Sequence, residues 1–306
     1  MKRIAALLSA LAALLLAAHA VLAAIPDPGA ANTNIVLFNP GTQDANLRLT
    51  LLNADQTGVA WTSDGGGPMA ANAMRIVPYS EFGGQAAGNW QGCADIASDR
   101  PLLALAVQFW DNTTTQQRWA AAYPARLEGA TEAFLPHLSK VDGRQTRITL
   151  QNCEDAQATA YIHFYSRKGG QPGLKTLTLQ PLTETTLYLD QVSEANFSST
   201  GNIGTGWITA TGRLAAAVQV FFSDRGEAYT AATAGETTLY FPGKLRVKNA
   251  DATYNYSAAN TQNLGTSTAN VHAQFIKRDG TVTYEFDDTI AARGTATYNT
   301  AYQSLP

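Results

Sequence analysis

The side chains best suited to redox chemistry are two cysteines. Cys93 and Cys153 are the only cysteines among 306 residues, and an even number is compatible with one disulfide bond. In an extended string of domains, both would lie at the same end of their own domain, one domain length apart. That distance exceeds the ~7 Å between Cα atoms that a disulfide spans. A bond therefore requires the domains to fold back side by side, and a bond and two separate thiols stay open as equal alternatives.

The histidines and paired acidic residues do not predict a metal or catalytic site. His163 and His272 alternate onto the outward face of predicted strands, and His137 lies apart from both. Scattered, solvated histidines are poor metal ligands. Asp287 and Asp288 are neighbours in one strand, so their carboxylates point to opposite faces and cannot share a proton. We therefore expect no catalytic residue, no cofactor and no metal.

The short motifs of common enzyme classes are missing from the sequence. It has no Gly-x-Ser-x-Gly, no His-Glu-x-x-His and no Cys-x-x-Cys. The run Gly65-Gly66-Gly67 precedes Pro68 and does not join a strand to a helix, so it predicts a loop rather than a phosphate cradle. These observations predict a protein that is not an enzyme.

Aromatic residues are the nearest signal for ligand binding. Tyr161 and Tyr165 alternate onto one outward face of a predicted strand. Trp61, Trp90 and Trp119 lie in or near predicted loops. Exposed rings stack on sugars or anchor protein partners, although rings that cover a domain end or an inter-repeat joint are the commoner case. These five residues are the candidate ligand contacts.

A repeat of roughly 110 residues positions all these side chains. Three segments share the order strand, Asn-bearing turn, strand: 34–39 with 47–51, 147–152 with 160–164, and 254–260 with 271–275. Leu51 and Phe164 are 113 positions apart, and Phe164 and Phe275 are 111 apart. The apolar runs 102–110 and 214–222 repeat as well, and Val107-Gln108 and Val218-Gln219 within them are 111 positions apart. Agreement in separate blocks indicates tandem domains.

The local period within these segments is two. The apolar positions are Leu47, Leu49 and Leu51, then Ala158, Ala160, Ile162 and Phe164, then Ala269, Val271, Ala273 and Phe275. Strict alternation places one face on a core and the other in water, as in antiparallel sheets. With Gly and Asn turns between short strands, this predicts an all-β fold of tandem Ig-like antiparallel β-sandwiches. Leu49 and Ile162 should then have equivalent surroundings.

The domain boundaries follow from the repeat. We predict sandwiches at 30–125 and 133–233 and a partial one at 238–306, joined by short linkers that leave neighbours semi-rigid. The third repeat lacks counterparts of the strands around 92–96 and 102–110, which would expose an apolar face and an unpaired edge. Two explanations stay open: the sequence is a truncated reading of a longer array, or the repeat self-associates through strands donated by another subunit.

The N-terminus predicts export. Lys2 and Arg3 precede an apolar run at 4–18, and small residues follow it, which is typical of a secretory signal peptide at 1–24. A transmembrane anchor is the alternative, but the run is short for a span. We expect the remainder to be secreted, extracellular or periplasmic, without a membrane span. The formal net charge of −3 provides no basic field for nucleic acid.

The string at 92–104 resembles a segment of tandem Ig-like repeats in exported, largely uncharacterised bacterial surface and secreted proteins. In those repeats a Gly-Ser-Ala-x-Val strand and a Ser-Asp-x-Pro-Leu-Ala turn precede an apolar strand. Here 92–96 read Gly-Cys-Ala-Asp-Ile and 98–104 read Ser-Asp-Arg-Pro-Leu-Leu-Ala. The second repeat departs from the pattern at Trp207 and at 211–213, and the third matches only at its start. The resemblance implies location and architecture, and it brings no catalytic residues.

These patterns together predict a secreted or cell-surface structural and adhesive repeat protein without catalytic activity. Its expected partner is a protein or glycan at the cell surface, and not nucleic acid. Two alternatives remain. One is an array of carbohydrate-binding modules that uses the five aromatic residues. The other is a non-catalytic part of a larger exported enzyme.

Overall fold

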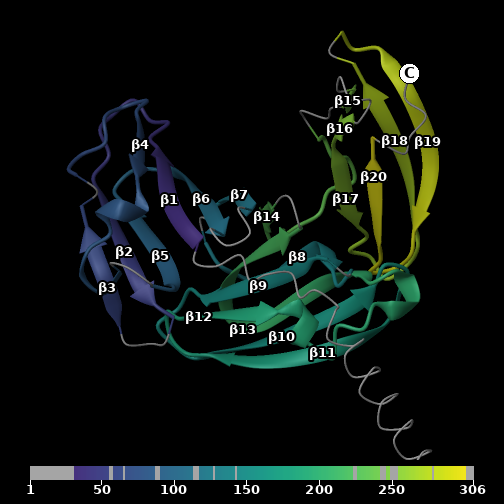
Figure 1. The fold of residues 1–306 in the computed structure, drawn as a ribbon, viewed down its shortest axis with the longest axis horizontal. Coiled ribbons are helices and arrows are strands. Elements are labelled where there is room, and N and C mark those ends of the chain that lie inside the picture. Colours follow the sequence, from purple (N-terminus) through teal and green to yellow (C-terminus); the bar gives the residue numbers. More distant parts are fainter. Residues whose placement is uncertain are drawn as a thin grey trace, which may run out of the picture.

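The computed structural model describes residues 31–54, 58–64, 66–86, 90–112, 117–126, 128–141, 143–222, 226–241, 246–248, 254–277 and 279–300. The predicted signal peptide at 1–24 lies outside them. The regular structure in these ranges is β-strand, apart from short 3₁₀ turns, and the strand pairs are antiparallel (Figure 1). The all-β prediction is confirmed. None of the described segments forms a helix with the length and hydropathy of a membrane span.

The strands fall into three groups along the chain, which we call repeats 1, 2 and 3. Repeat 1 contains β1 (Ala31–Phe38), β2 (Leu47–Asn53), β3 (Val59–Ser63), β4 (Met74–Val77), β5 (Gly92–Ser98), β6 (Leu103–Asn112) and β7 (Gln117–Pro124), with η1 (Tyr79–Glu81) and η2 (Gly84–Ala86). Repeat 2 contains β8 (Ala130–Ser139), β9 (Gln145–Asn152), β10 (Ala158–Ser166), β11 (Gly169–Leu179), β12 (Glu184–Tyr188), β13 (Ile203–Phe221) and β14 (Gly226–Thr230), with η3 (Leu189–Gln191) and η4 (Ser198–Thr200). Repeat 3 contains β15 (Arg246–Lys248), β16 (Tyr254–Tyr256), β17 (Ala258–Gln262), β18 (Ala269–Ile276), β19 (Val282–Ile290) and β20 (Thr295–Asn299).

Repeat 1 is built from two facing sheets, with strand orders β4-β1-β6-β7 and β3-β2-β5. Alternation directs Leu37 of β1 and Leu49 of β2 into the space between the sheets, where both are fully buried. Apolar side chains removed from water in this way supply the main stabilisation of the fold.

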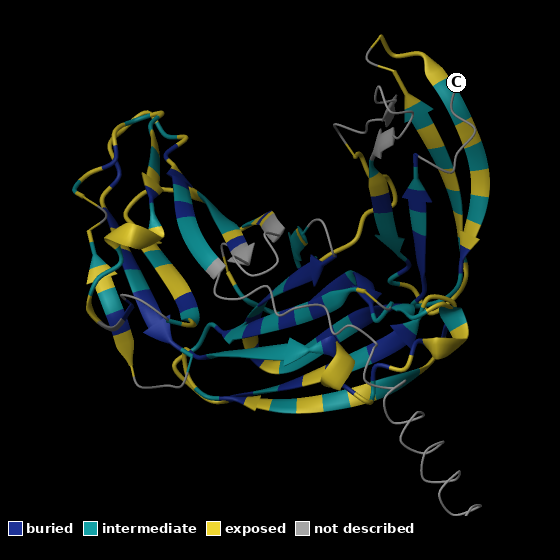
Figure 2. Cartoon of the chain, viewed as in Figure 1, coloured by how far each residue is buried: buried dark blue, intermediate teal, exposed yellow. Residues whose placement is uncertain are grey.

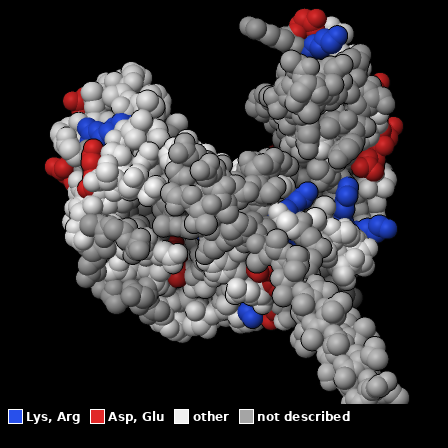
Figure 3. Space-filling model, viewed as in Figure 1, with Lys and Arg blue, Asp and Glu red and all other residues white. Residues whose placement is uncertain are grey.

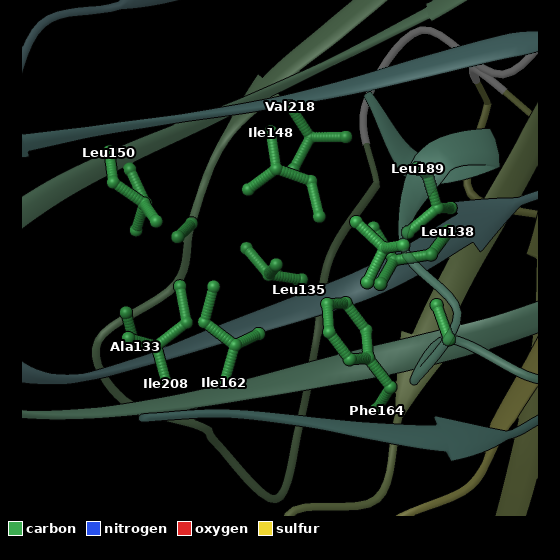
Figure 4. Packing of buried hydrophobic residues seen from close by; sticks show 14 of the residues in the cluster. Ala133, Leu135, Leu138, Ile148, Leu150, Ile162, Phe164, Leu189, Ile208 and Val218 are labelled. Carbon is green, nitrogen blue, oxygen red and sulfur yellow. The ribbon is translucent and has the colours of Figure 1, made fainter. Parts of the chain in front are cut away.

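In repeat 2 a single strand of 19 residues, β13, takes part in both layers. Its first half pairs with β10 and β8, and its second half pairs with β9 and β14. Ile208 therefore lies opposite Ile162, and Val218 lies opposite Ile148. Figure 4 shows these side chains converging with Leu135 in the core of the repeat.

The strand equivalence predicted from the repeat is present in the structure. Leu49 of β2 lies between β3 and β5, and Ile162 of β10 lies between β11 and β13. Both side chains are fully buried. The alternation predicted for β2 and β18 is confirmed as well.

A buried asparagine lies at the end of β9 and directly after β1 and β17: Asn152, Asn39 and Asn263. Each Nδ2 donates to the carbonyl four residues later and to two consecutive carbonyls at the turn before β4, β12 or β20, over 2.7 to 3.4 Å. Each Oδ1 accepts from the backbone amide two residues later. One carboxamide thus ties three stretches of chain together.

The third asparagine differs from the one that the sequence predicts. The predicted strand-and-turn segment 254–260 ends at Asn260 and does not include Asn263. Asn260 lies within β17, where its Oδ1 accepts a hydrogen bond from the Thr297 hydroxyl. The residue with the buried network is Asn263. Its spacing of 111 from Asn152, after 113 between Asn39 and Asn152, matches the rest of the repeat.

Repeat 3 has counterparts of β1 to β4 of repeat 1 and of β9 to β12 of repeat 2. Sheet pairs β17-β20 and β18-β19 correspond to β9-β12 and β10-β11 in register, since Ala158 faces Leu179 and Ala269 faces Ile290. The predicted hairpin at Asp279-Gly280 joins β18 to β19, and Gly280 takes a φ of 88° there. In the described part of repeat 3, β5, β6 and β7 have no counterpart.

The three repeats form a curved array rather than an extended string. Figure 1 shows repeat 1 (purple and blue) and repeat 3 (yellow) rising from the same side of repeat 2 (teal and green). The extended arrangement on which the cysteine argument rested is therefore wrong.

Asn152→Asp should lower the free energy of unfolding of repeat 2 by about 3 kcal/mol, because it turns a buried donor toward three carbonyl oxygens into an acceptor. Urea unfolding of the purified protein measures this. The matched control is Asn196→Asp, an exposed residue whose Oδ1 accepts from Ser198 and is retained in Asp. Equal losses in the two variants would contradict the assigned role.

Candidate functional site

The five aromatic candidates do not form one binding surface. Trp61 and Trp90 belong to repeat 1, whereas Tyr161 and Tyr165 belong to repeat 2. Trp119 lies in β7 opposite Trp110, and its side chain is outside the described structure. Tyr161 is 38% exposed on the outer face of β10. A continuous aromatic platform is therefore not present among these residues.

The prediction that Tyr165 shares the outward face of Tyr161 is wrong, since Tyr165 is only 7% exposed. The pairing of β10 with β11 shifts register between Phe164 and Ser166. Such a bulge inserts an extra residue and breaks the two-residue alternation. Two consecutive side chains, Phe164 and Tyr165, are buried as a result.

Trp61 and Trp90 pack onto repeat 1. Trp61 lies within the short strand β3, and the centroid of its ring is 5.6 Å from that of Phe82. The Trp90 indole donates a hydrogen bond of 2.8 Å to Oδ1 of Asn53. Both indoles are half-buried against the core of repeat 1. They therefore stabilise this repeat and are not ligand contacts.

Repeats 1 and 2 are joined by equivalent residues of the two repeats. The rings of Trp110 and Phe221 meet edge to face, with centroids 4.7 Å apart, and both residues are buried. The Gln219 amide donates to the side-chain oxygen of Gln108. Since 110 and 221, and 108 and 219, are each 111 positions apart, β6 and β13 contact each other through the same surface. This is the arrangement of a two-fold symmetric interface within one chain.

Both cysteines are free thiols and lie at a second contact between repeats 1 and 2. The Cys93 sulfur lies 3.9 Å from the carbonyl oxygen of Leu182 in repeat 2, and the Leu182 amide donates to the Glu154 carbonyl, next to Cys153. Burial raises the pKa of Cys93 to about 12 and also raises that of Cys153. Both side chains are therefore protonated near neutral pH, which makes them weak nucleophiles.

Repeats 2 and 3 are joined around Trp207. Its ring stacks on His163 at 5.0 Å, and the Arg293 guanidinium lies 4.2 Å from the indole centroid. The indole donates to Glu132 over 2.8 Å. Desolvation, and then the charge of Arg293, lower the pKa of His163. Trp207 lies opposite His163 in the pairing of β10 with β13. Its position at a joint depends on Arg293, which is 86 residues away.

Backbone contacts hold the same joint at close range. The Thr205 hydroxyl donates to the Arg293 carbonyl over 2.9 Å, and the Thr295 amide donates to the Arg167 carbonyl over 3.0 Å. A Cβ on Gly169 would lie 2.2 Å from the Ala292 carbonyl oxygen. Glycine is therefore required at this turn, because any side chain would push repeat 3 away.

An open groove of ≈ 1980 Å³ lies in repeat 3 and reaches the edge of repeat 2. It is lined by the inner residues of β17 and β18, by the chain segment before β15, and by Phe134 and Pro136 of β8. Leu239, Tyr240 and Phe241 form one wall of this groove and are exposed. The sequence reasoning did not single out these three residues.

The described residues contain no group of three or more His, Cys, Asp or Glu side chains arranged to hold a metal ion. His272 contacts Asp287 across β18 and β19, at 2.9 Å, on an exposed face. This contact raises the pKa of His272. On the face drawn in Figure 3, the described charges of both signs are scattered.

Comparisons with known proteins add a family match. Residues 112–306 match the model described as "Family of unknown function (DUF5719)". No curated protein matches the chain. A solved structure, "Crystal Structure of Thermotoga maritima 1070", is 13% identical, with 34% of this chain and 94% of that chain covered and a TM-score of 0.31. A score this low carries no argument about fold or function.

Glu184 should make the joint between repeats 1 and 2 depend on pH. Burial raises the pKa of Glu184 from 4.5 to about 7. The pKa values of Tyr123 and Cys93 in repeat 1 are raised first by their own burial and then by the charge of Glu184, so this carboxyl lies close to both. The folded protein holds this proton more tightly than the unfolded chain. The free energy of unfolding should therefore fall as pH rises from about 4.5 to about 7, and stay level above that.

Thermal unfolding across this pH range measures the effect. Glu184→Gln should flatten the slope, whereas Glu81→Gln, at an exposed residue of η1, should keep it. Identical slopes in wild type and Glu184→Gln would show that the buried carboxyl is not responsible.

Proposed function

The chain belongs to the family of unknown function DUF5719, and we propose that it is a secreted or cell-surface structural repeat protein. In this role it is a non-catalytic scaffold that holds adhesive surfaces at fixed spacing. The single observation that carries the proposal is that both joints between repeats are packed and hydrogen-bonded rather than left as loose linkers.

The joint between repeats 1 and 2 supports a rigid scaffold. Trp110, Ala121 and Phe221 form a buried cluster separate from the cores of both repeats. Arg147 places its guanidinium 4.9 Å from the centroid of the Phe221 ring. A hydrophobic joint of this kind restrains domain motion, which is otherwise the default for domains on short linkers.

The joint between repeats 2 and 3 supports the same role by other means. Arg293 has a left-handed φ of 59°, which is unusual for a residue other than glycine. In this conformation its carbonyl accepts from Thr205 and its guanidinium lies over Trp207. Strained backbone persists where surrounding contacts compensate for it.

Export supports the location in the proposal. The positive residues and apolar run of the first 24 residues are those of a secretory signal peptide. Attachment of the producing cells to surfaces tests the adhesive role directly. Deleting the gene should reduce attachment, and restoring the wild-type chain should recover it; unchanged attachment after deletion would contradict the proposal.

Trp110→Ala should loosen the scaffold without unfolding the repeats, because the cluster that it removes lies outside both repeat cores. Small-angle X-ray scattering should show a larger radius of gyration and a broader distance distribution. Phe109→Ala is the control, since Phe109 is the preceding residue of β6 and is exposed. In producing cells, Trp110→Ala should be secreted at the wild-type level yet restore attachment poorly. A scattering curve identical to wild type would argue against a rigid joint.

A further inference from the structure

The inner face of repeat 3 is open where the same face is closed in repeats 1 and 2. The equivalent inner positions are Leu47, Leu49 and Leu51 on β2, Ala160, Ile162 and Phe164 on β10, and Val271, Ala273 and Phe275 on β18. Those of β2 and β10 are buried, whereas those of β18 are half-buried. Figure 2 shows β18 and β19 striped in teal and yellow, while dark blue runs through the middle of repeat 2.

The difference follows from strand pairing. β2 lies between β3 and β5, and β10 lies between β11 and β13. Among the described strands, β18 pairs with β19 alone. The edge of β18 that corresponds to the β13 side of β10 is therefore a template for another strand.

The residues of a second wall of the groove are also buried in repeat 2 and exposed in repeat 3. The sequence Phe134-Leu135-Pro136 recurs as Tyr240-Phe241-Pro242. In repeat 2 this stretch belongs to β8 and pairs with the first half of β13. There Ala133, Phe134 and Leu135 are 3%, 6% and 0% exposed. The counterparts Leu239, Tyr240 and Phe241 are 50%, 86% and 43% exposed.

β13 indicates what the groove would accept. It is an extended strand that places Ile208 against Ile162 and Val218 against Ile148. Mapped onto repeat 3, these positions face Ala273 of β18 and Ala259 of β17, which both line the groove.

A glycine in the incoming strand would fit between two large side chains. In repeat 2, Gly206 pairs with Phe164 on one side and with Leu135 on the other. A Cβ on Gly206 would lie 2.8 Å from Cδ1 of Leu135. In repeat 3 the counterpart of Phe164 is Phe275, and the counterpart of Leu135 is the larger Phe241.

We propose that the groove of repeat 3 is a strand-acceptor site, which binds an extended segment of another protein by β-augmentation. The segment has alternating apolar residues, with a glycine opposite Phe275. Main-chain hydrogen bonds to β18 give affinity, and the groove between β17, β18 and 239–241 selects the alternating side chains. This inference goes beyond the scaffold function and does not rest on it.

A second folded copy of this chain is a poor donor. The strands that take this position in the other repeats are β5, which pairs with β2, and β13, which pairs with β10 and β8. Removing β5 would uncover Leu47, Leu49 and Leu51 in the core of repeat 1. Removing β13 would dismantle the buried core of repeat 2, including Ile162 and Ile148. This cost favours a different polypeptide over a second folded copy as the donor.

Binding of a labelled peptide to the full chain tests the proposal. The probe is a peptide with the sequence of β13, Ile203–Phe221. Fluorescence anisotropy should show saturable binding, and hydrogen exchange at Ala269–Ile276 should slow when the peptide is present. The same peptide with its glycine at the position of Gly206 changed to valine should bind about tenfold more weakly, because the valine clashes with both walls.

Two protein variants locate the site. Ala273→Arg fills the groove and should weaken binding about tenfold. Glu285→Arg, on the exposed face of β19 and outside the groove lining, should change binding less than about twofold. The glycine-to-valine peptide leaves the protein unchanged, so the proposal stays testable even if Ala273→Arg unfolds repeat 3.

Three results would overturn the proposal. One is no saturable binding of the β13 peptide together with unchanged exchange at β18. Another is equal binding of the glycine and valine peptides. The third is a dimer in light scattering in which β18 is already protected, because the groove would then be occupied by a second copy.

Discussion

In each repeat, the carboxamide of one buried asparagine holds together the end of β1, β9 or β17, the turn that follows that strand, and the turn before β4, β12 or β20. A buried polar side chain destabilises the fold unless its hydrogen bonds are made, and here each oxygen and nitrogen is used. The geometry of both turns is therefore coupled to the burial of Asn39, Asn152 or Asn263. These turns set the register with which alternating apolar residues enter the core.

The curved shape follows from two different joints, one between equivalent surfaces of repeats 1 and 2 and one between unlike surfaces of repeats 2 and 3. Repeats 1 and 2 each have a strand with an aromatic residue at its end, and Trp110 and Phe221 meet because both repeats present the same surface. Repeat 3 has no such strand among its described residues, so it joins repeat 2 through turn backbone and the contact of Arg293 with Trp207. Among the described residues of repeat 3, β13 has no counterpart. The second half of such a strand would supply the missing aromatic contact, and its first half would close the groove beside β18.

Much of the sheet architecture could be predicted from sequence because apolar alternation is a local property. Leu49 and Ile162 were placed correctly in this way. Tyr165 was not, since a bulge in the pairing with β11 interrupts the alternation. The joints could not be predicted, because Trp207 and Arg293 are far apart in sequence. The sequence does contain a signal for the exposed wall at Leu239–Phe241, because Phe134-Leu135-Pro136 recurs as Tyr240-Phe241-Pro242. These two segments are 106 positions apart, however, whereas the other matched positions of repeats 2 and 3 have a spacing of 111.

Side-chain amide exchange measured by NMR tests the asparagine networks most directly. After transfer to heavy water, the Nδ2 protons of Asn39, Asn152 and Asn263 should persist far longer than those of exposed asparagines such as Asn196 and Asn270, because they are buried and bonded to carbonyls. Three slowly exchanging carboxamides would support one repeated network as the organising contact. Exchange of all asparagine side chains at the rate of the exposed ones would contradict it.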